Sequence, residues 1–310
     1  MLEFLRPTLQ KLHTLSKAES NCWINAISPT ENELRTLKSL IPMSSAQIEL
    51  LRDPDQIPSV DEQKEYTFII AQAPIESKKD RFGYRTVPIG MFVTKDKIAT
   101  LCFFHDEALE IVKRERFEFR KTQVVFRILM ASANLYLKDL KEIRQKMYVV
   151  ETYLSETIGN KYVLELLELE QSLTYFDTAL KSNKILLKRL AKEEKTNKLI
   201  MVKTIEDKRL VEHMTDLSNQ AIEVANVYST ILANMLNAFA SIISNNLNNI
   251  IRVLTSVTIV IALPTLIASI YGMNINLPFQ TNAHAFLIVM VCSFTASFLF
   301  LMVLLKKKFI

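Results

Sequence analysis

The sequence predicts an α+β protein, in which a small N-terminal α/β domain is followed by long helices and two C-terminal membrane-spanning helices. Three observations support this fold class. The 310 residues include four glycines, whereas average usage near 7% would give about twenty, so a turn-rich all-β fold is disfavoured. No proline lies between Pro88 and Pro264, which favours long helices. Residues 253–305 contain no Asp, Glu, Lys or Arg.

The same composition excludes several functional classes. With so few glycines, neither a GxGxxG dinucleotide loop nor a Walker loop occurs, and the HExxH, GxSxG and CxxC patterns are absent as well. We therefore expect no enzyme, no catalytic residues and no cofactor. The net charge of +5 is too small to indicate a nucleic-acid partner.

Residues 1–115 are expected to form a cytoplasmic α/β domain. Thr30 and Glu33 have the spacing of a capping box, which predicts a helix beginning after Thr30. Four segments rich in β-branched, aromatic and other apolar residues predict strands: Cys22–Ile27, Tyr66–Ala73, Val87–Thr94 and Ile98–Phe104.

Long helices are expected next. In residues 116–203, apolar residues recur at helical spacing on both sides of Gly159, which predicts a helical hairpin that turns at this glycine. A third helical segment, residues 204–270, would form a stalk that continues into the first membrane span. As one helix it would be about 100 Å long at 1.5 Å per residue.

The uncharged C-terminal region predicts two transmembrane helices, because each of its apolar segments approaches the roughly 20 residues that cross a bilayer. The first ends at residue 270, and the second covers residues 285–305. The alternative, a buried hairpin in a soluble protein, is disfavoured because such a hairpin would carry charges on its solvent faces.

Lysines set the expected topology. Lys306, Lys307 and Lys308 lie in the tail, residues 306–310, and Arg252 precedes the first span, whereas the connecting loop, residues 271–284, has no Lys or Arg. The positive-inside rule then places both termini in the cytoplasm and the loop outside. A two-span chain whose N-terminus lacks a signal-peptide core suits the plasma membrane, here a bacterial inner membrane.

A neutral polar track follows the stalk helix into the first span. Residues 224–251 have no charge but seven asparagines. Steps of 3.5 residues, as in a supercoiled bundle, define a track with Leu254 beside it: Asn237, Ser241, Ser244, Asn248, Ile251, Thr255, Thr258, Ala262 and Thr265. Such a track is typical either of polar contacts between packed helices or of a pore with an apolar constriction at Ile251 and Leu254.

The end of this helix resembles a known family. Gly272, Met273 and Asn274 directly follow the first of two C-terminal spans, and this arrangement is the signature of the CorA magnesium transporter family. Other segments are similar to the family too: Cys22–Asn25, Pro264 with Thr265, and the basic tail. The tip of the predicted hairpin is acidic, as in the family, with Glu151, Glu156, Glu165, Glu168 and Glu170.

The resemblance implies a funnel-shaped homopentamer in a lipid bilayer, with one long helix from each subunit lining a central pore. Five copies of Asn274, with carbonyls of Gly272, would form the selectivity filter, and Gly272 would let the chain turn there. The lysines of the tail would form a basic ring. Mg²⁺ would be both the transported and the regulatory ion, with Co²⁺ and Ni²⁺ as further cargo.

The sequence departs from the family pattern in two places. The loop after Asn274 has no acidic residue. The family also senses intracellular Mg²⁺ through carboxylates at subunit interfaces, and by rough alignment Leu50 and His213 stand at those positions. Nearby carboxylates could substitute: Glu49, Glu212 and Asp216.

A zinc transporter of the same signature family, with or without proton coupling, is the alternative function. Zinc usually prefers His and Cys ligands, and the predicted track contains neither. His284 in the loop is the one candidate ligand.

Overall fold

The computed structural model describes residues 1–10, 12–76, 83–104, 107–154, 160–192, 199–200, 202, 204–274, 278 and 284–307. Glu156, Gly159 and Lys308, all singled out above, lie outside these residues. The chain divides into two compact units, Met1–Leu236 and Asn237–Ile310.

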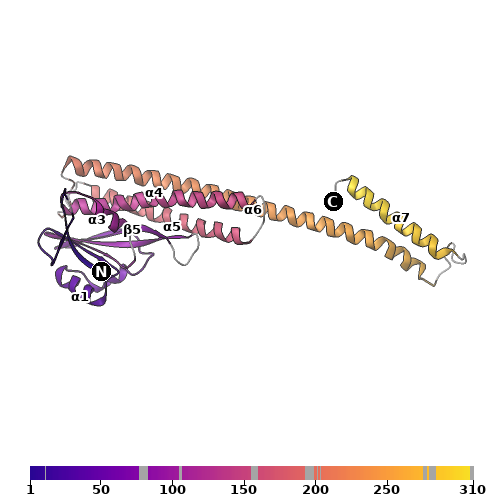
Figure 1. The fold of residues 1–310 in the computed structure, drawn as a ribbon, viewed down its shortest axis with the longest axis horizontal. Coiled ribbons are helices and arrows are strands. Elements are labelled where there is room, and N and C mark those ends of the chain that lie inside the picture. The colour runs from indigo at the N-terminus through magenta and orange to yellow at the C-terminus, as the bar shows by residue number, and fades with distance from the viewer. Residues whose placement is uncertain are drawn as a thin grey trace. The chain divides into compact units, whose positions relative to one another are not determined.

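The first unit combines a sheet with helices (Figure 1). Its strands are β1 (Leu2–Pro7), β2 (Leu12–Leu15), β3 (Cys22–Ile27), β4 (Ser59–Glu62), β5 (Tyr66–Glu76), β6 (Tyr84–Thr94) and β7 (Lys97–Cys102). Its helices are α1 (Glu31–Leu40), α2 (Ser45–Leu50), α3 (Glu107–Arg114), α4 (Lys121–Leu154) and α5 (Asn160–Ala191). A 67-residue helix, α6 (Ile205–Tyr271), begins in this unit and ends in the second, which also contains α7 (Ala285–Lys306).

The strands form one sheet in the order β2-β1-β3-β7-β6-β5-β4. The pairing of β3 with β7 is parallel, with Trp23 opposite Ile98, and the other pairings are antiparallel. The four strands expected from sequence are confirmed as β3, β5, β6 and β7. The strands β1, β2 and β4 were missed, because these outer strands are short or only partly buried and carry polar residues among their apolar ones.

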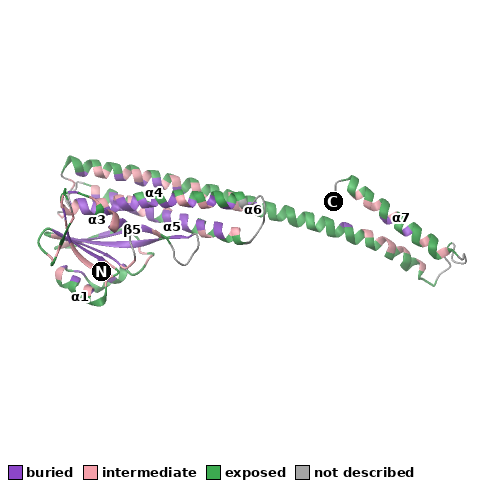
Figure 2. Ribbon diagram, in the orientation of Figure 1, coloured by how far each residue is buried: buried purple, intermediate pink, exposed green. Residues whose placement is uncertain are grey.

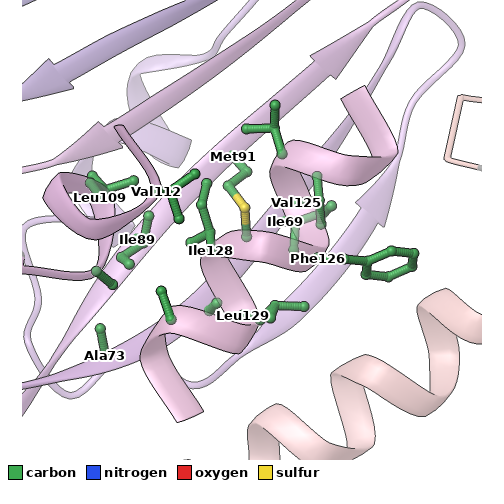
Figure 3. Packing of buried hydrophobic residues seen from close by; sticks show 14 of the residues in the cluster. Ile69, Ala73, Ile89, Met91, Leu109, Val112, Val125, Phe126, Ile128 and Leu129 are labelled. Carbon is green, nitrogen blue, oxygen red and sulfur yellow. The ribbon is translucent and has the colours of Figure 1, made fainter. Parts of the chain in front are cut away.

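Helices cover both faces of the sheet, which is why the central strands are almost continuously buried (Figure 2). One core packs α1 and α2 against side chains such as Ile24 and Phe92. The other packs α3, α4 and α5 against the opposite face. Figure 3 shows part of this second core, where Ile69 and Met91 of the strands lie near Val125 of α4.

The predicted capping box is confirmed at the start of α1. The Thr30 hydroxyl accepts from the backbone N–H of Glu33 at 3.3 Å, and the Glu33 carboxylate accepts from the Thr30 N–H at 2.8 Å. Glu33 also accepts from the Leu2 N–H at 2.9 Å. These hydrogen bonds, chiefly the one from the Thr30 backbone, lower the pKa of Glu33. The cap therefore also ties α1 to the first strand.

Side-chain hydrogen bonds fasten α5 to the sheet. The Asn183 amide pairs with the backbone of Gln72, accepting from its N–H at 3.1 Å and donating to its carbonyl at 2.7 Å. The Ser172 hydroxyl accepts from the Tyr84 N–H at 2.8 Å. Both contacts satisfy buried backbone groups on β5 and β6, so they fix the position of α5 on the sheet.

Asp139 of α4 is a buried carboxyl group. Only 8% of the residue is exposed. Burial, and then the negative charge of Glu142 one turn further along the helix, raise the pKa of Asp139 to about 7, although Lys138 opposes the shift. The side chain therefore changes its charge near neutral pH.

We expect the Asp139→Asn variant to gain stability relative to the wild type as the pH rises. The native state holds the Asp139 proton up to about pH 7, whereas the unfolded chain releases it near pH 4. The free energy of unfolding of the wild type therefore falls as the pH rises from about 4 to about 7, by about 2 to 4 kcal/mol in total. Thermal unfolding of both proteins between pH 4 and pH 8 measures the difference. The exposed Asp61, replaced by Asn, is the control, and a pH-independent difference for Asp139→Asn would contradict the expectation.

Candidate ion-conduction site

The second unit contains the end of α6, the residues after it and α7. Both helices are long and apolar enough to cross a membrane. Within the most apolar 18-residue segment of α6 and of α7, only 6% and 11% is buried, respectively. A core hairpin of a soluble protein would bury most of that surface. The exposed apolar side chains therefore support the two expected membrane spans, and α7 ends within one residue of the predicted boundary.

Serines are the buried polar residues of these two helices within the second unit. In this unit, the buried polar residues of α6 and α7 are Ser256, Ser293 and Ser297. Ser256 donates to the Arg252 carbonyl at 2.8 Å and Ser293 to the Met290 carbonyl at 3.0 Å. Small residues let two helices approach closely in a membrane. These buried serines were not predicted from the sequence, although Ser293 and Ser297 have the four-residue spacing of one helix face.

The predicted polar track includes none of these buried serines. All of its residues are exposed: Asn237, Ser241, Ser244, Asn248, Ile251, Thr255, Thr258, Ala262 and Thr265. Leu254 beside it is 64% exposed and Ile251 is 50% exposed. The side chains of the track therefore remain free to face other copies, lipid or a pore.

Several hydroxyl groups on the track already use their protons. Ser241 donates to the Asn237 carbonyl at 3.0 Å, Thr258 to the Leu254 carbonyl at 2.8 Å and Thr265 to the Ile261 carbonyl at 3.0 Å. A hydroxyl has one proton and two lone pairs. Each of these oxygens therefore presents acceptor positions away from its helix, which suits the hydrogens of water around a cation.

The α6 helix ends at the glycine–methionine–asparagine triplet. The Gly272 N–H donates to the Ala268 carbonyl at 3.0 Å, and the Met273 N–H donates to the Ile270 carbonyl at 3.2 Å. No glycine in the described residues has a positive φ, so Gly272 ends the helix without a left-handed backbone conformation. Gly272, Met273 and Asn274 are all exposed, which leaves the Asn274 amide available to a ligand.

The predicted regulatory carboxylates are not brought together within one chain. Glu49 lies at the end of α2, 3.5 Å from Arg52 Nε, whereas Glu212 and Asp216 are exposed on α6. Among the described residues, no group of three His, Cys, Asp or Glu side chains is close enough to hold a metal ion. Of the basic tail, Lys306 and Lys307 are exposed at the end of α7.

A large α/β unit, two helices apolar enough to span a membrane, and an exposed neutral polar track on the helix that ends at Gly-Met-Asn together define a two-span membrane transporter of ions. The chain belongs to the family described as CorA-like Mg²⁺ transporter protein, which matches residues 18–307. Family membership makes it a transporter of divalent cations.

Individual relatives agree with this assignment. The cobalt/magnesium transport protein CorA of Methanocaldococcus jannaschii is 25% identical over 283 residues, covering 86% of this chain and 84% of the relative. The complete structure of the CorA magnesium transporter from the same organism matches with a TM-score of 0.81 and 23% identity, covering 100% of this chain and 99% of the other. The ZntB cytoplasmic domain from Vibrio parahaemolyticus shares the fold at 9% identity, with a TM-score of 0.59, over 79% of this chain and 96% of that domain.

Proposed function

We propose that this protein is a homopentameric channel that conducts hydrated Mg²⁺ across the plasma membrane. The observation that carries the proposal is the exposed Gly272-Met273-Asn274 triplet, which directly follows the uncharged, apolar end of α6 and precedes a second apolar helix. The CorA relative in Methanocaldococcus jannaschii is named as a cobalt and magnesium transporter, which supports Mg²⁺ and Co²⁺ as cargo, and Ni²⁺ would share the path.

Selection of a hydrated ion follows from the chemistry of Mg²⁺, which loses its bound water reluctantly. A ring of Asn274 amide oxygens, with Gly272 carbonyls, would accept hydrogen bonds from the water shell without removing it. The loop has no acidic residue to attract cations, so capture would depend on these neutral oxygens.

The polar track would form the path below the filter. Rings of Thr265, Thr258 and Asn248 oxygens would pass the hydrated ion along, and Ile251 and Leu254 would form the narrow apolar segment that loses its water when the channel closes. With both termini in the cytoplasm, Lys306, Lys307 and Lys308 would form a basic ring on the cytoplasmic side.

Cytoplasmic divalent ions would control whether the apolar segment at Ile251 and Leu254 is open or closed. Carboxylates at subunit interfaces repel one another unless a cation bridges them. Low Mg²⁺ would therefore let the subunits separate and the pore open, with Glu49, Glu212 and Asp216 as the proposed regulatory ligands. Because these residues lie apart within one chain, the sites would need two subunits.

Ion flux into proteoliposomes tests the proposal. We expect Mg²⁺ uptake that does not depend on an imposed pH gradient, with Co²⁺ and Ni²⁺ also transported. Uptake of Zn²⁺ alone, driven by the pH gradient, would instead establish the zinc transporter. The same protein can be sized in detergent, where any assembly other than five subunits would contradict the pentamer.

A further inference from the structure

The start of α6 is fixed by a buried ionic cluster. Thr204 and Asp207 cap the helix reciprocally: the Asp207 N–H donates to the Thr204 hydroxyl at 3.1 Å, and the Thr204 N–H donates to the Asp207 carboxylate at 3.1 Å. The Asp207 side chain is only 1% exposed. A buried carboxylate is costly unless hydrogen bonds and an opposite charge compensate it.

The compensating groups come from α4 and the residue just before it. One guanidinium nitrogen of Arg120, Nη1, lies 3.0 Å from both carboxylate oxygens of Asp207. The amide of Gln123 donates to the same carboxylate at 2.9 Å, and Arg127 orients this amide by donating to its oxygen at 3.2 Å. The pKa of Asp207 is lowered, because these hydrogen bonds and the Arg120 charge outweigh the opposing effect of burial. The carboxylate therefore stays charged at neutral pH.

Most of the other buried residues of α6 in the first unit are apolar. Met214, Ala221, Ala225 and Leu232 are buried along it, and Leu210 and Val211 pack against the main core. Apolar burial is non-directional, so this stripe alone permits the helix to slide or rotate slightly. A charge-assisted cluster imposes a defined geometry. The Arg120–Asp207 pair therefore sets the axial position and rotation of the first turn of α6 relative to α4.

We infer that the Arg120–Asp207 pair is the anchor through which the α/β unit moves α6, the helix that also contains the first membrane span. Arg120 and Asp207 are positioning residues, because they would act on the pore through this helix. The inference rests on the proposed function, specifically on control of the channel by cytoplasmic Mg²⁺. With the anchor intact, a displacement of α4 is imposed on the start of α6. Without it, the apolar stripe absorbs part of that displacement.

Full-length Asp207→Asn protein in liposomes tests the anchor. We expect the cytoplasmic Mg²⁺ concentration that half-inhibits flux to change by about fivefold or more, while maximal flux at low Mg²⁺ stays within about twofold. Amide hydrogen exchange at residues 208–214 should accelerate by about tenfold, because the first turns of α6 open locally more often. The matched control is Glu206→Gln, since Glu206 also contacts Arg120, at 2.9 Å, but is 65% exposed; it should change neither quantity by more than about twofold.

A second control separates anchoring from general destabilisation. Leu37→Ala removes a buried side chain of α1 and should lower the melting temperature without changing the half-inhibiting concentration. An equal change in Leu37→Ala and Asp207→Asn would overturn the anchor. If Asp207→Asn does not fold, Arg120→Lys replaces it: this variant keeps the charge but loses the planar guanidinium, and an unchanged half-inhibiting concentration would likewise overturn the inference.

The wild type distinguishes failure of the anchor from failure of the proposed control by cytoplasmic Mg²⁺. Inhibition of the wild type by cytoplasmic Mg²⁺, together with unchanged inhibition of a folded Asp207→Asn protein, would reject the anchor alone. A wild type that cytoplasmic Mg²⁺ does not inhibit would reject the proposed control of the channel, and the anchor's role with it.

Discussion

Replacing Asn274 with alanine should reduce Mg²⁺ flux by about 100-fold or more, equivalent to about 2.7 kcal/mol in the barrier to permeation. In the proposed filter the side-chain amide is the group that holds the water shell of the ion. It is exposed after the end of α6, so its removal leaves no cavity and no unpaired buried group. The variant should therefore keep the oligomeric size and melting temperature of the wild type. Isotopic or fluorescent Mg²⁺ flux into proteoliposomes measures the loss.

The control for this experiment is a second exposed asparagine, Asn246, which lies on α6 outside the polar track. Asn246→Ala should keep flux within about twofold of the wild type. Normal Mg²⁺ flux in Asn274→Ala would remove Asn274 from the filter. An equal loss in both variants would show a general effect of removing an amide rather than selection by a ring.

Glycine at Leu254 or Ile251 should raise leakage through the closed channel by about tenfold or more. The two side chains are large, apolar and exposed on or beside the polar track, and the proposed closed state depends on water leaving the space between them. Removing these side chains widens that space, so water and ions remain. Leakage is measured as Mg²⁺ flux at a cytoplasmic Mg²⁺ concentration that closes the wild type.

Because glycine also lowers the stability of a helix by about 1 kcal/mol, the control must place a glycine elsewhere in the same helix. Ile242→Gly meets this need, since Ile242 is 40% exposed and lies on the face of α6 opposite the track. It should not leak. Unchanged leakage in both Leu254→Gly and Ile251→Gly would place the closing segment in another part of the path.

The long helices were predicted closely, because no glycine or proline occurs between Gly159 and Pro264: α6 begins at Ile205 and ends at Tyr271, one residue from each expected bound. The central strands were equally readable, since both of their faces are buried and their residues are almost continuously apolar. Whether the outer strands form depends instead on pairing with neighbouring strands. For example, β4 (Ser59–Glu62) has one buried residue, Val60, and joins the sheet only because β5 is available.

The candidate site was predictable to the extent that it is local in sequence. The Gly-Met-Asn triplet is contiguous, and the track repeats along one helix. The Asp207 cluster was not predicted, because its partners, Arg120 and Gln123, are more than 80 residues away and only the fold brings them together. The lining of the pore stays a prediction for a similar reason: a single chain leaves the track exposed, and its assignment needs the other subunits.

Because α6 is one continuous helix, the number of residues between Asp207 and Asn248 would set which face of the helix lines the proposed pore. Each residue of an α-helix adds about 100° of rotation. Inserting a single alanine in this interval would turn every downstream side chain by that angle, so that a face carrying Asn248 and Thr265 would point to a neighbour or to lipid. Seven inserted residues bring the face back to within about 20°, at the cost of a longer stalk. In the proposed channel, lengthening of this helix would therefore be compatible with conduction only in near-whole turns, even where the inserted residues contact nothing.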